Sequence, residues 1–277
     1  MSTEQMRWLL KVIQPERTLA SLPGGAGLSQ ETHAALLGLP PEVYAAELSR
    51  MRAAAREAAG ELLADDAVAS MVDRLPLRKG AKVVAFGDSL TSEPQSWAVI
   101  LSELLAARRA ADGISVAISA VGGETTMHGL VRVGEVVGQQ PDWILFLLGT
   151  NDARTQGSNP TKTLVHHEET GRNVAELRQR VSRETKARCV WITPPAVNEE
   201  QVAGHWGLAR FGVRFRNEDL ARVAQIVRDI DALAIDVFSN LGTPPPADLL
   251  MGDGLHFTLA GQKRLALEVI KGWSKLK

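Results

Sequence analysis

The stretch Val83-Val84-Ala85-Phe86-Gly87-Asp88-Ser89-Leu90-Thr91 is an apolar run that leads directly into Gly-Asp-Ser. This run is too hydrophobic for a strand with one face exposed to solvent. It is typical of a strand in a parallel sheet that is covered on both faces. The turn that follows can display a hydroxyl, so Ser89 is the leading candidate nucleophile. A serine hydroxyl needs a base, a group that orients the base and an oxyanion site before it can attack. The rest of the chain must supply them.

More short apolar runs alternate with helical patterns from residue 81 onward. The expected strands are 82–86, 114–119, 143–148, 188–193 and 232–237. The expected helices are 96–109, 127–137, 166–185, 217–230 and 258–274. Such alternation predicts right-handed crossovers and a three-layer α/β/α sandwich with a mostly parallel five-stranded sheet. Ligands bind such sheets at the carboxyl ends of the strands.

Residues 1–78 differ from residues 79–277 in composition and hydrophobic pattern. They are rich in alanine and leucine and contain no convincing strand. Good helix formers follow Pro40-Pro41, which predicts a helix from Glu42 to about Leu63. We therefore expect a helical N-terminal region before a catalytic domain. That region could be a lid, a packing layer or an oligomerisation element. Its long helix has apolar positions on more than one face, which favours burial against a partner surface and makes a homodimer plausible.

The bulk composition narrows the function classes. The chain has 277 residues, with 31 basic and 32 acidic side chains and a net charge of -1, so nucleic acid is not an expected partner. Its single cysteine, Cys189, excludes a disulfide within the chain and a cysteine-rich metal site. We see neither an apolar stretch of secretory length near Trp8-Leu9-Leu10-Lys11 nor a membrane span. The expectation is a soluble cytoplasmic protein.

A candidate base lies near the C-terminus, in Asp253-Gly254-Leu255-His256. An acid three residues before a histidine can hold the imidazole, fix its tautomer and stabilise the imidazolium. Ser89, His256 and Asp253 can therefore form a triad. Taken alone, Asp253 could be a turn residue and His256 a structural histidine.

Two other strand ends offer donors for an oxyanion. Asn151, in Gly149-Thr150-Asn151-Asp152, has a side-chain amide, and Gly123 has a backbone N–H that no side chain shields. The N–H of Ser89 would be the third donor. The alternatives are that Asn151 caps a turn and that the Gly122-Gly123 pair merely permits positive φ.

Together these four blocks resemble the SGNH, or GDSL, hydrolase family of esterases and lipases. The resemblance covers about residues 81–275 and implies a flavodoxin-like sandwich. It also implies Ser89 as nucleophile, His256 as base with Asp253 as its partner, and Gly123 and Asn151 as oxyanion donors. Two departures are visible: Gly122 stands where many relatives have serine, and Phe257 where many have proline. Neither removes a reacting group.

The sequence lacks the motifs that other hydrolytic enzymes require. The Gly-x-Ser-x-Gly elbow of α/β-hydrolases is absent because Thr91 occupies the final glycine position. No Asp-x-His pair follows the first strand, as a metallophosphoesterase would require, and no phosphate-binding loop follows any strand. We expect neither a metal nor another cofactor.

The segment 194–217 contains aromatic and arginine side chains and could either line the substrate pocket or pack with a solvated arginine face. Within it, Trp206 and Phe211 are candidate substrate-binding residues. His128, close to the expected oxyanion loop, is a third.

The sequence thus predicts a serine esterase that acts on a small-molecule ester with a short or medium acyl group, through an acyl-enzyme. Acyl transfer to another acceptor would use the same acyl-enzyme. A non-catalytic binding module on a hydrolase-like fold is the alternative from another class.

Overall fold

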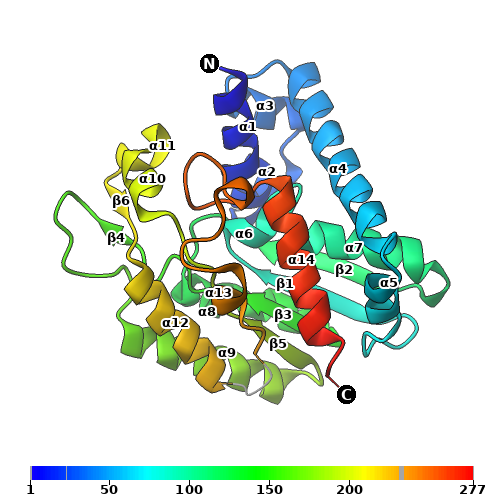
Figure 1. Ribbon diagram of the computed structural model, residues 1–277. Helices are drawn as coiled ribbons and strands as arrows, with labels where there is room; N and C mark the ends of the chain where they lie inside the picture. Colours follow the sequence, from blue (N-terminus) through cyan, green and yellow to red (C-terminus); the bar gives the residue numbers. More distant parts are fainter. Residues whose placement is uncertain (1, 23, 231–233, 277) are drawn as a thin grey trace.

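The computed structural model describes residues 2–22, 24–230 and 234–276. Its central sheet has the order β2-β1-β3-β5, with all neighbours parallel (Figure 1). The strands are β1 (Lys82–Gly87), β2 (Ser115–Ala120), β3 (Trp143–Leu147) and β5 (Arg188–Ile192). The predicted fold class is confirmed. The expected fifth strand, 232–237, is reduced to one parallel bridge between Ile192 and Ile235, and its residues 232 and 233 lie outside the described residues.

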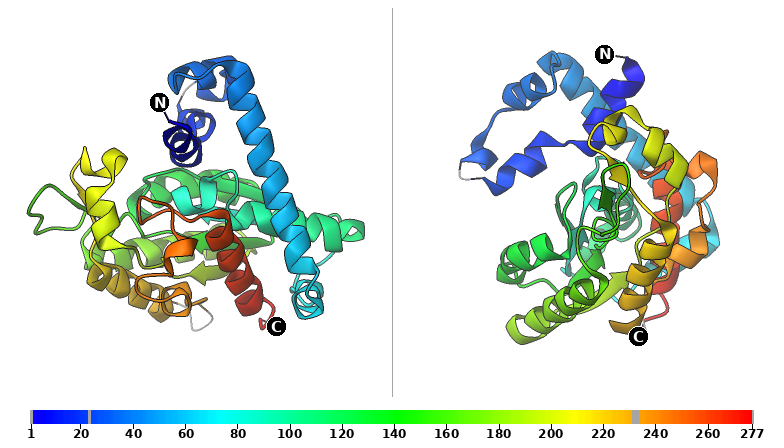
Figure 2. Two further views of the ribbon diagram at one scale, coloured as in Figure 1. Left: turned by 45° about the horizontal axis from the view of Figure 1, so that its top comes forward. Right: turned by 90° about the vertical axis from the view of Figure 1, so that its left-hand side faces the viewer.

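Side chains of β1 alternate between two hydrophobic cores, as strand geometry requires. Val83 and Ala85 belong to the core under α4 (Pro41–Leu63), α5 (Asp66–Asp73), α7 (Trp97–Arg108) and α14 (Leu259–Trp273). Val84 and Phe86 belong to the core under α8 (Thr126–Gly138), α9 (His167–Glu184) and α12 (Asn217–Ile230). Helices therefore cover both faces of the sheet, as Figure 2 shows.

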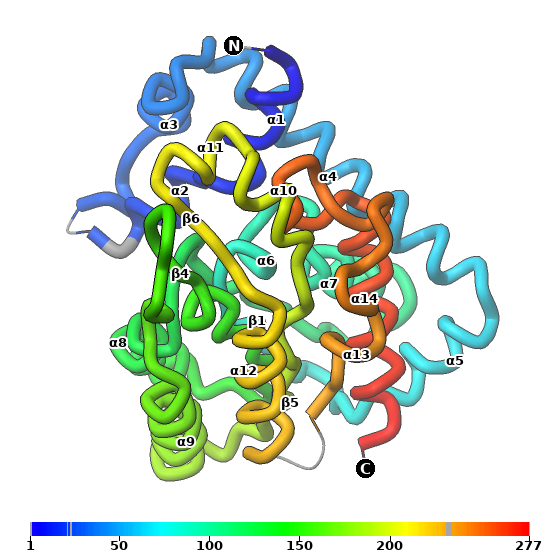
Figure 3. The backbone as a smooth tube through the Cα atoms, turned by 60° about the vertical axis from the view of Figure 1, so that its left-hand side comes forward, coloured from blue at the N-terminus to red at the C-terminus, as the bar shows by residue number. Residues whose placement is uncertain are grey.

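The N-terminal helices form two groups. Helices α1 (Thr3–Val12), α2 (Pro15–Thr18) and α3 (Gln30–Leu36) lie above the sheet in the view of Figure 3. The second half of α4, together with α5, shares the larger core with α7 and α14, and the first half of α4 shares a smaller core with α1 and α3. The apolar face of α4 is covered within the chain. A boundary near residue 78 and a homodimer both stay predictions.

The shorter elements surround the carboxyl ends of the strands. They are α6 (Ser89–Ser92), α10 (Glu199–Gly204), α11 (Trp206–Ala209), α13 (Val237–Leu241), the antiparallel pair β4 (Thr155–Gln156) and β6 (Val213–Arg214), and the 3-10 helices Leu19–Ser21, Gly25–Gly27 and Ala247–Leu249. The 3-10 helix Ala110–Asp112 lies instead at the amino ends, where the carbonyl of Asp112 accepts the N–H of Gly80. In the described ranges, no helix has the length and apolar character that crossing a bilayer requires.

Trp273 tests the packing of α14 on the sheet. Its ring is fully buried and meets Trp143 of β3 edge-on, with 5.3 Å between ring centroids. Trp273→Ala would leave a large cavity, so we expect it to lower the free energy of unfolding by about 3 to 5 kcal/mol. Urea unfolding measures this loss. Phe211→Ala, at an aromatic that is 62% exposed, is the control and should cost far less. Equal losses would contradict the assigned core.

Candidate functional site

The structure brings Ser89, His256 and Asp253 together at the carboxyl end of β1. Ser89 is the first residue of α6, directly after the strand and its N-cap Asp88. The Oγ atom of Ser89 lies 3.0 Å from Nε2 of His256, and Nδ1 of His256 lies 2.6 Å from Oδ2 of Asp253. The hydrogen-bonded chain from hydroxyl to imidazole to carboxylate is the arrangement that activates a serine.

Asp253 is buried, yet it is held ionised. Burial alone raises the pKa of the carboxyl, but the charge of His256 and hydrogen bonds from His256 and Leu255 outweigh it and hold the pKa well below its usual range. The Oδ1 atom of Asp253 accepts from the backbone N–H groups of Leu255 and His256, at 3.0 and 2.9 Å. The spacing of the Asp253-x-x-His256 segment therefore fixes the carboxylate as well as the imidazole.

His256 is buried as well. Desolvation lowers the pKa of its imidazole, but the charge of Asp253 and its hydrogen bond dominate and raise the pKa above the ordinary 6.5. Asp88 beneath the nucleophile is fully buried, and desolvation raises its pKa to about 7, although the Leu90 N–H and the charge of His256 oppose this. Asp88 caps α6 through the Leu90 N–H, at 3.1 Å.

The proposed oxyanion donors surround the serine. Gly123 has φ +82°, a conformation that favours glycine, and it lines the same cavity as Ser89. One N–H of the Asn151 amide donates to the carbonyl of Glu124 at 3.0 Å. The same amide nitrogen lies 3.5 Å from Oδ2 of Asp88, a long contact that its second N–H would give up in order to donate to a ligand. The N–H of Ser89 has no partner within α6 because it belongs to the first residue of the helix.

Buried polar contacts hold the loops that carry these donors. Asp152 accepts from the N–H of Thr126 at 2.9 Å and from the hydroxyl of Thr170 at 3.0 Å, which ties the Asn151 loop to α8 and α9. Glu124, which follows Gly123, is bound by the guanidinium of Arg132 at 2.7 Å. Donors held in this way need little rearrangement when charge develops.

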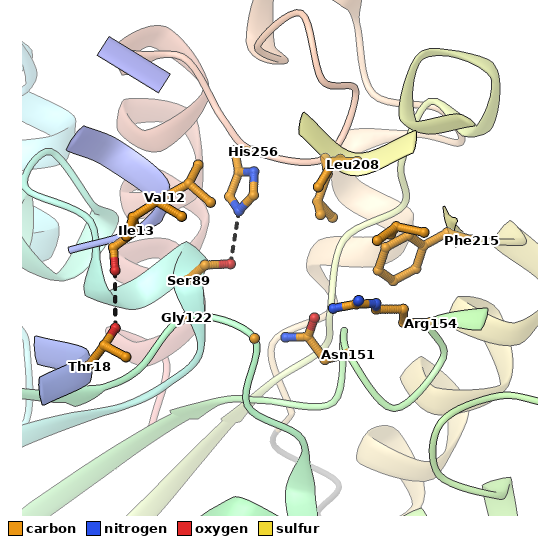
Figure 4. A pocket seen from close by; sticks show the side chains of 13 residues that line it. Val12, Ile13, Thr18, Ser89, Gly122, Asn151, Arg154, Leu208, Phe215 and His256 are labelled. Carbon is orange, nitrogen blue, oxygen red and sulfur yellow. Dashed lines mark hydrogen bonds between the residues drawn. The ribbon is translucent and has the colours of Figure 1, made fainter. Parts of the chain in front are cut away.

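A cavity of about 280 Å³ opens at Ser89. Figure 4 shows Ser89 and His256 at its centre, with Val12 and Ile13 on one side and Leu208 and Phe215 on the other. The full lining is Val12, Ile13, Thr18, Ser89, Gly122, Gly123, Asn151, Arg154, Leu208, Val213, Phe215, Leu255 and His256. The walls are thus mostly apolar around a polar centre, as in a site for an organic ligand.

Three predicted substrate residues lie elsewhere. Nδ1 of His128 accepts the N–H of Thr125 and so caps α8, and His128 is exposed outside the cavity lining. Trp206 and Phe211 are 48% and 62% exposed and do not line the cavity either. Contact of these three residues with a substrate has no support in this geometry. Their segment does reach the cavity, through Leu208, Val213 and Phe215.

Other residues of the site carry no motif. Val12, Ile13 and Thr18 come from the N-terminal helices, and Arg154 follows the Asn151 block. The Nε1 atom of Trp8 donates to Oδ2 of Asp253 at 2.6 Å. In the sequence, the spacing of apolar and basic residues in α1 predicts that one face of a helix is buried. It does not show which segment of the chain that face contacts.

Within residues 2–22, 24–230 and 234–276, no group of three or more histidine, cysteine, aspartate or glutamate side chains is placed to hold a metal ion.

Residues 85–264 match the model of the GDSL-like lipase/acylhydrolase family. The chain belongs to this family. The resemblance noted from the four sequence blocks is thereby confirmed. A GDSL esterase/lipase of Arabidopsis thaliana is 24% identical, and the match covers 69% of this chain and 63% of that protein. The chain thus spans less than two thirds of the length of this curated relative.

Solved structures share the fold. A lipase/acylhydrolase from Enterococcus faecalis superimposes with a TM-score of 0.56 at 22% identity, over 70% of this chain and 96% of that one. The acetylxylan esterase Axe2 from Geobacillus stearothermophilus gives a TM-score of 0.54 at 20% identity, over 71% of this chain and 95% of that one. The part of this chain that superimposes on both structures is therefore the GDSL-type sandwich.

The pKa of His256 can be tested without any substrate. We expect NMR titration to place it above 6.5, because the carboxylate of Asp253 stabilises the imidazolium. Asp253→Asn removes that charge while the imidazole stays buried, so the pKa should fall. An unchanged pKa in Asp253→Asn would contradict the assigned pairing.

Proposed function

We propose that the protein is a serine esterase that hydrolyses carboxylic esters with a short or medium acyl group. The observation that carries the proposal is the 3.0 Å contact between Ser89 Oγ and His256 Nε2, continued by the 2.6 Å contact between His256 and Asp253. Membership of a family described as lipases and acylhydrolases supports ester chemistry.

The first half of the reaction forms an acyl-enzyme. Ser89 Oγ attacks the ester carbonyl carbon while His256 Nε2 takes the hydroxyl proton, and Asp253 stabilises the imidazolium that results. The carbonyl π electrons move to oxygen, where the N–H groups of Ser89 and Gly123 and the amide of Asn151 receive the negative charge. The tetrahedral intermediate collapses as the bond to the alcohol oxygen breaks. His256 gives its proton to the departing alcohol.

The second half releases the acid. A water molecule loses a proton to His256 and attacks the acyl carbon, and the Ser89 oxygen leaves with the proton from His256. Both halves use the same three side chains and need no cofactor. A different acceptor in place of water would make the reaction an acyl transfer.

The cavity supports a short or medium acyl group. A volume of about 280 Å³ lies just below the usual range for ligand pockets, which begins at about 300 Å³. Leu208, Val213 and Phe215 supply an apolar wall for a hydrocarbon chain. Arg154 lines the same cavity, and desolvation lowers the pKa of its guanidinium.

Ser89→Ala tests the nucleophile. We expect the variant to lose hydrolysis of p-nitrophenyl butyrate by a factor of about 10³ or more and to lose fluorophosphonate labelling, because no other oxygen is activated by His256. Circular dichroism should be unchanged. The neighbouring serine of α6, Ser92, provides a matched control, and Ser92→Ala should still be labelled. Labelling of Ser89→Ala would rule out this nucleophile.

Phe215→Ala tests the acyl wall. Removing the ring enlarges the cavity, so kcat/KM for p-nitrophenyl octanoate should rise relative to that for the butyrate, by about tenfold. Phe211→Ala removes an exposed phenyl group of the same segment outside the lining and should leave the ratio unchanged. Equal ratios in the two variants would place the acyl chain elsewhere.

A further inference from the structure

The catalytic carboxylate has a donor from a distant part of the chain. Asp253 accepts four hydrogen bonds. Three come from its own segment, namely from the backbone N–H of Leu255 and from the backbone N–H and Nδ1 of His256. The fourth comes from the indole N–H of Trp8 in α1, which donates to Oδ2 at 2.6 Å. A carboxylate offers about four lone-pair positions, so Trp8 completes the set. Its acceptor is the oxygen that also binds His256.

The ring of Trp8 is fixed from the other side by α11. Trp206 packs edge-on against it and His205 lies tilted to it, each with 5.1 Å between ring centroids. A Cβ atom at Gly207 would lie 2.7 Å from a ring atom of Trp8, so only glycine lets this backbone approach so closely. The half-exposed Trp206 therefore covers the residue that holds Asp253.

Lys11, one turn further along α1, anchors the helix to both halves of the site. Its Nζ atom donates to the carbonyl of Phe257, the residue after His256, at 2.8 Å. It also forms an ion pair with Glu93, which ends the helix that begins with Ser89, at 2.9 Å. Both charged side chains are buried. Buried ion pairs add little net stability but restrict geometry, so this pair fixes the base segment relative to the nucleophile helix.

The end of the same helix forms a wall of the cavity. Val12 and Ile13 line it, and the carbonyl oxygen of Val12 would lie 3.1 Å from a Cβ atom at Gly122. The oxyanion loop and α1 thus approach each other closely. Helix α1 lies outside the residues 85–264 that match the family, so these contacts are an addition to the matched domain.

We propose that α1 is a working part of the catalytic site, in which Trp8 is a positioning residue that orients Asp253 and Lys11 docks the helix between the nucleophile and base segments. The proposal rests on the proposed esterase function. It assigns residues 3–12 a role in turnover as well as in packing. The indole N–H holds Oδ2 toward Nδ1 of His256 and shares its negative charge.

Trp8→Phe tests the role of the indole N–H, because the variant keeps an aromatic ring and loses the donor. With p-nitrophenyl butyrate we expect kcat to fall about tenfold while KM stays within twofold, since Trp8 does not line the cavity. The acid limb of kcat/KM should move to higher pH. Without the indole, more negative charge on Oδ2 faces the imidazolium, and a more basic His256 stays protonated to higher pH.

The other titratable and charged groups near His256 are not substituted in Trp8→Phe. They are Asp253, Glu93, Asp88, Lys11 and His205. Trp191→Phe is the matched control, because Trp191 is a buried indole of β5 whose N–H has no partner among the described residues. It should keep both kcat and the acid limb of the wild type.

The outcomes separate the inference from the function on which it rests. If the wild type neither hydrolyses esters nor reacts with a fluorophosphonate at Ser89, the esterase proposal fails and the role of Trp8 in turnover fails with it. If the wild type is active and Trp8→Phe equals it in kcat and acid limb, the inference alone is overturned.

A second variant covers the case in which Trp8→Phe does not fold by circular dichroism. Lys11→Met combined with Glu93→Gln removes both charges of the buried pair, which leaves no uncompensated charge. A lowered kcat with an unfolding temperature near that of the wild type supports the docking role. Wild-type kcat in this double variant overturns it.

Discussion

A carboxylate removed from water is the constraint on which the site depends. Burying an ionised group costs several kcal/mol unless hydrogen bonds and an opposite charge replace its hydration. At Asp253 the replacement comes from two backbone N–H groups, an imidazole and an indole. Each donor must approach the carboxylate along a different lone-pair direction. The need to satisfy Asp253 therefore fixes the turn from Asp253 to His256 and the position of α1 beside it.

The other polar groups of the site follow the same rule. Asp152 and Glu124 are buried carboxylates with hydroxyl, backbone or guanidinium partners on neighbouring helices. These partners hold the loops that carry Asn151 and Gly123. The loops at the carboxyl ends of the strands are therefore held by buried polar contacts, which would keep the proposed oxyanion donors in place before a ligand binds.

Much of the sheet and the four sequence blocks of the candidate site could be predicted from the sequence, because both are local signals. The boundaries of the expected strands and helices agree with the observed ones to within one residue, apart from the edge strand. Strand ends of a parallel sheet meet at one edge, so Ser89, Gly123 and Asn151 converge there. The turn that precedes α14 brings His256 to them. The exception, at residue 235, pairs with β5 through one bridge. Local patterns do not say how far pairing extends at the edge of a sheet.

The residues that escaped prediction are those whose partners lie far away in sequence. Within 194–217, aromaticity favoured Trp206 and Phe211, but Trp206 packs against Trp8 and Phe211 is largely exposed. Leu208 and Phe215 line the cavity instead. The sequence of α1 contains no sign that Trp8 meets an aspartate. Only the packed tertiary structure supplies that information.

The Trp8–Asp253 hydrogen bond joins residues 245 positions apart. Closing a loop of this length costs entropy that one hydrogen bond does not repay, so we expect this contact to form after contacts that are closer in sequence. The sheet, its helices and the turn at His256 can all be in place before this hydrogen bond closes. With the role proposed for Trp8, full ester turnover would then be acquired in the last step of folding, and partly folded chains with a native-like sheet would be poor catalysts.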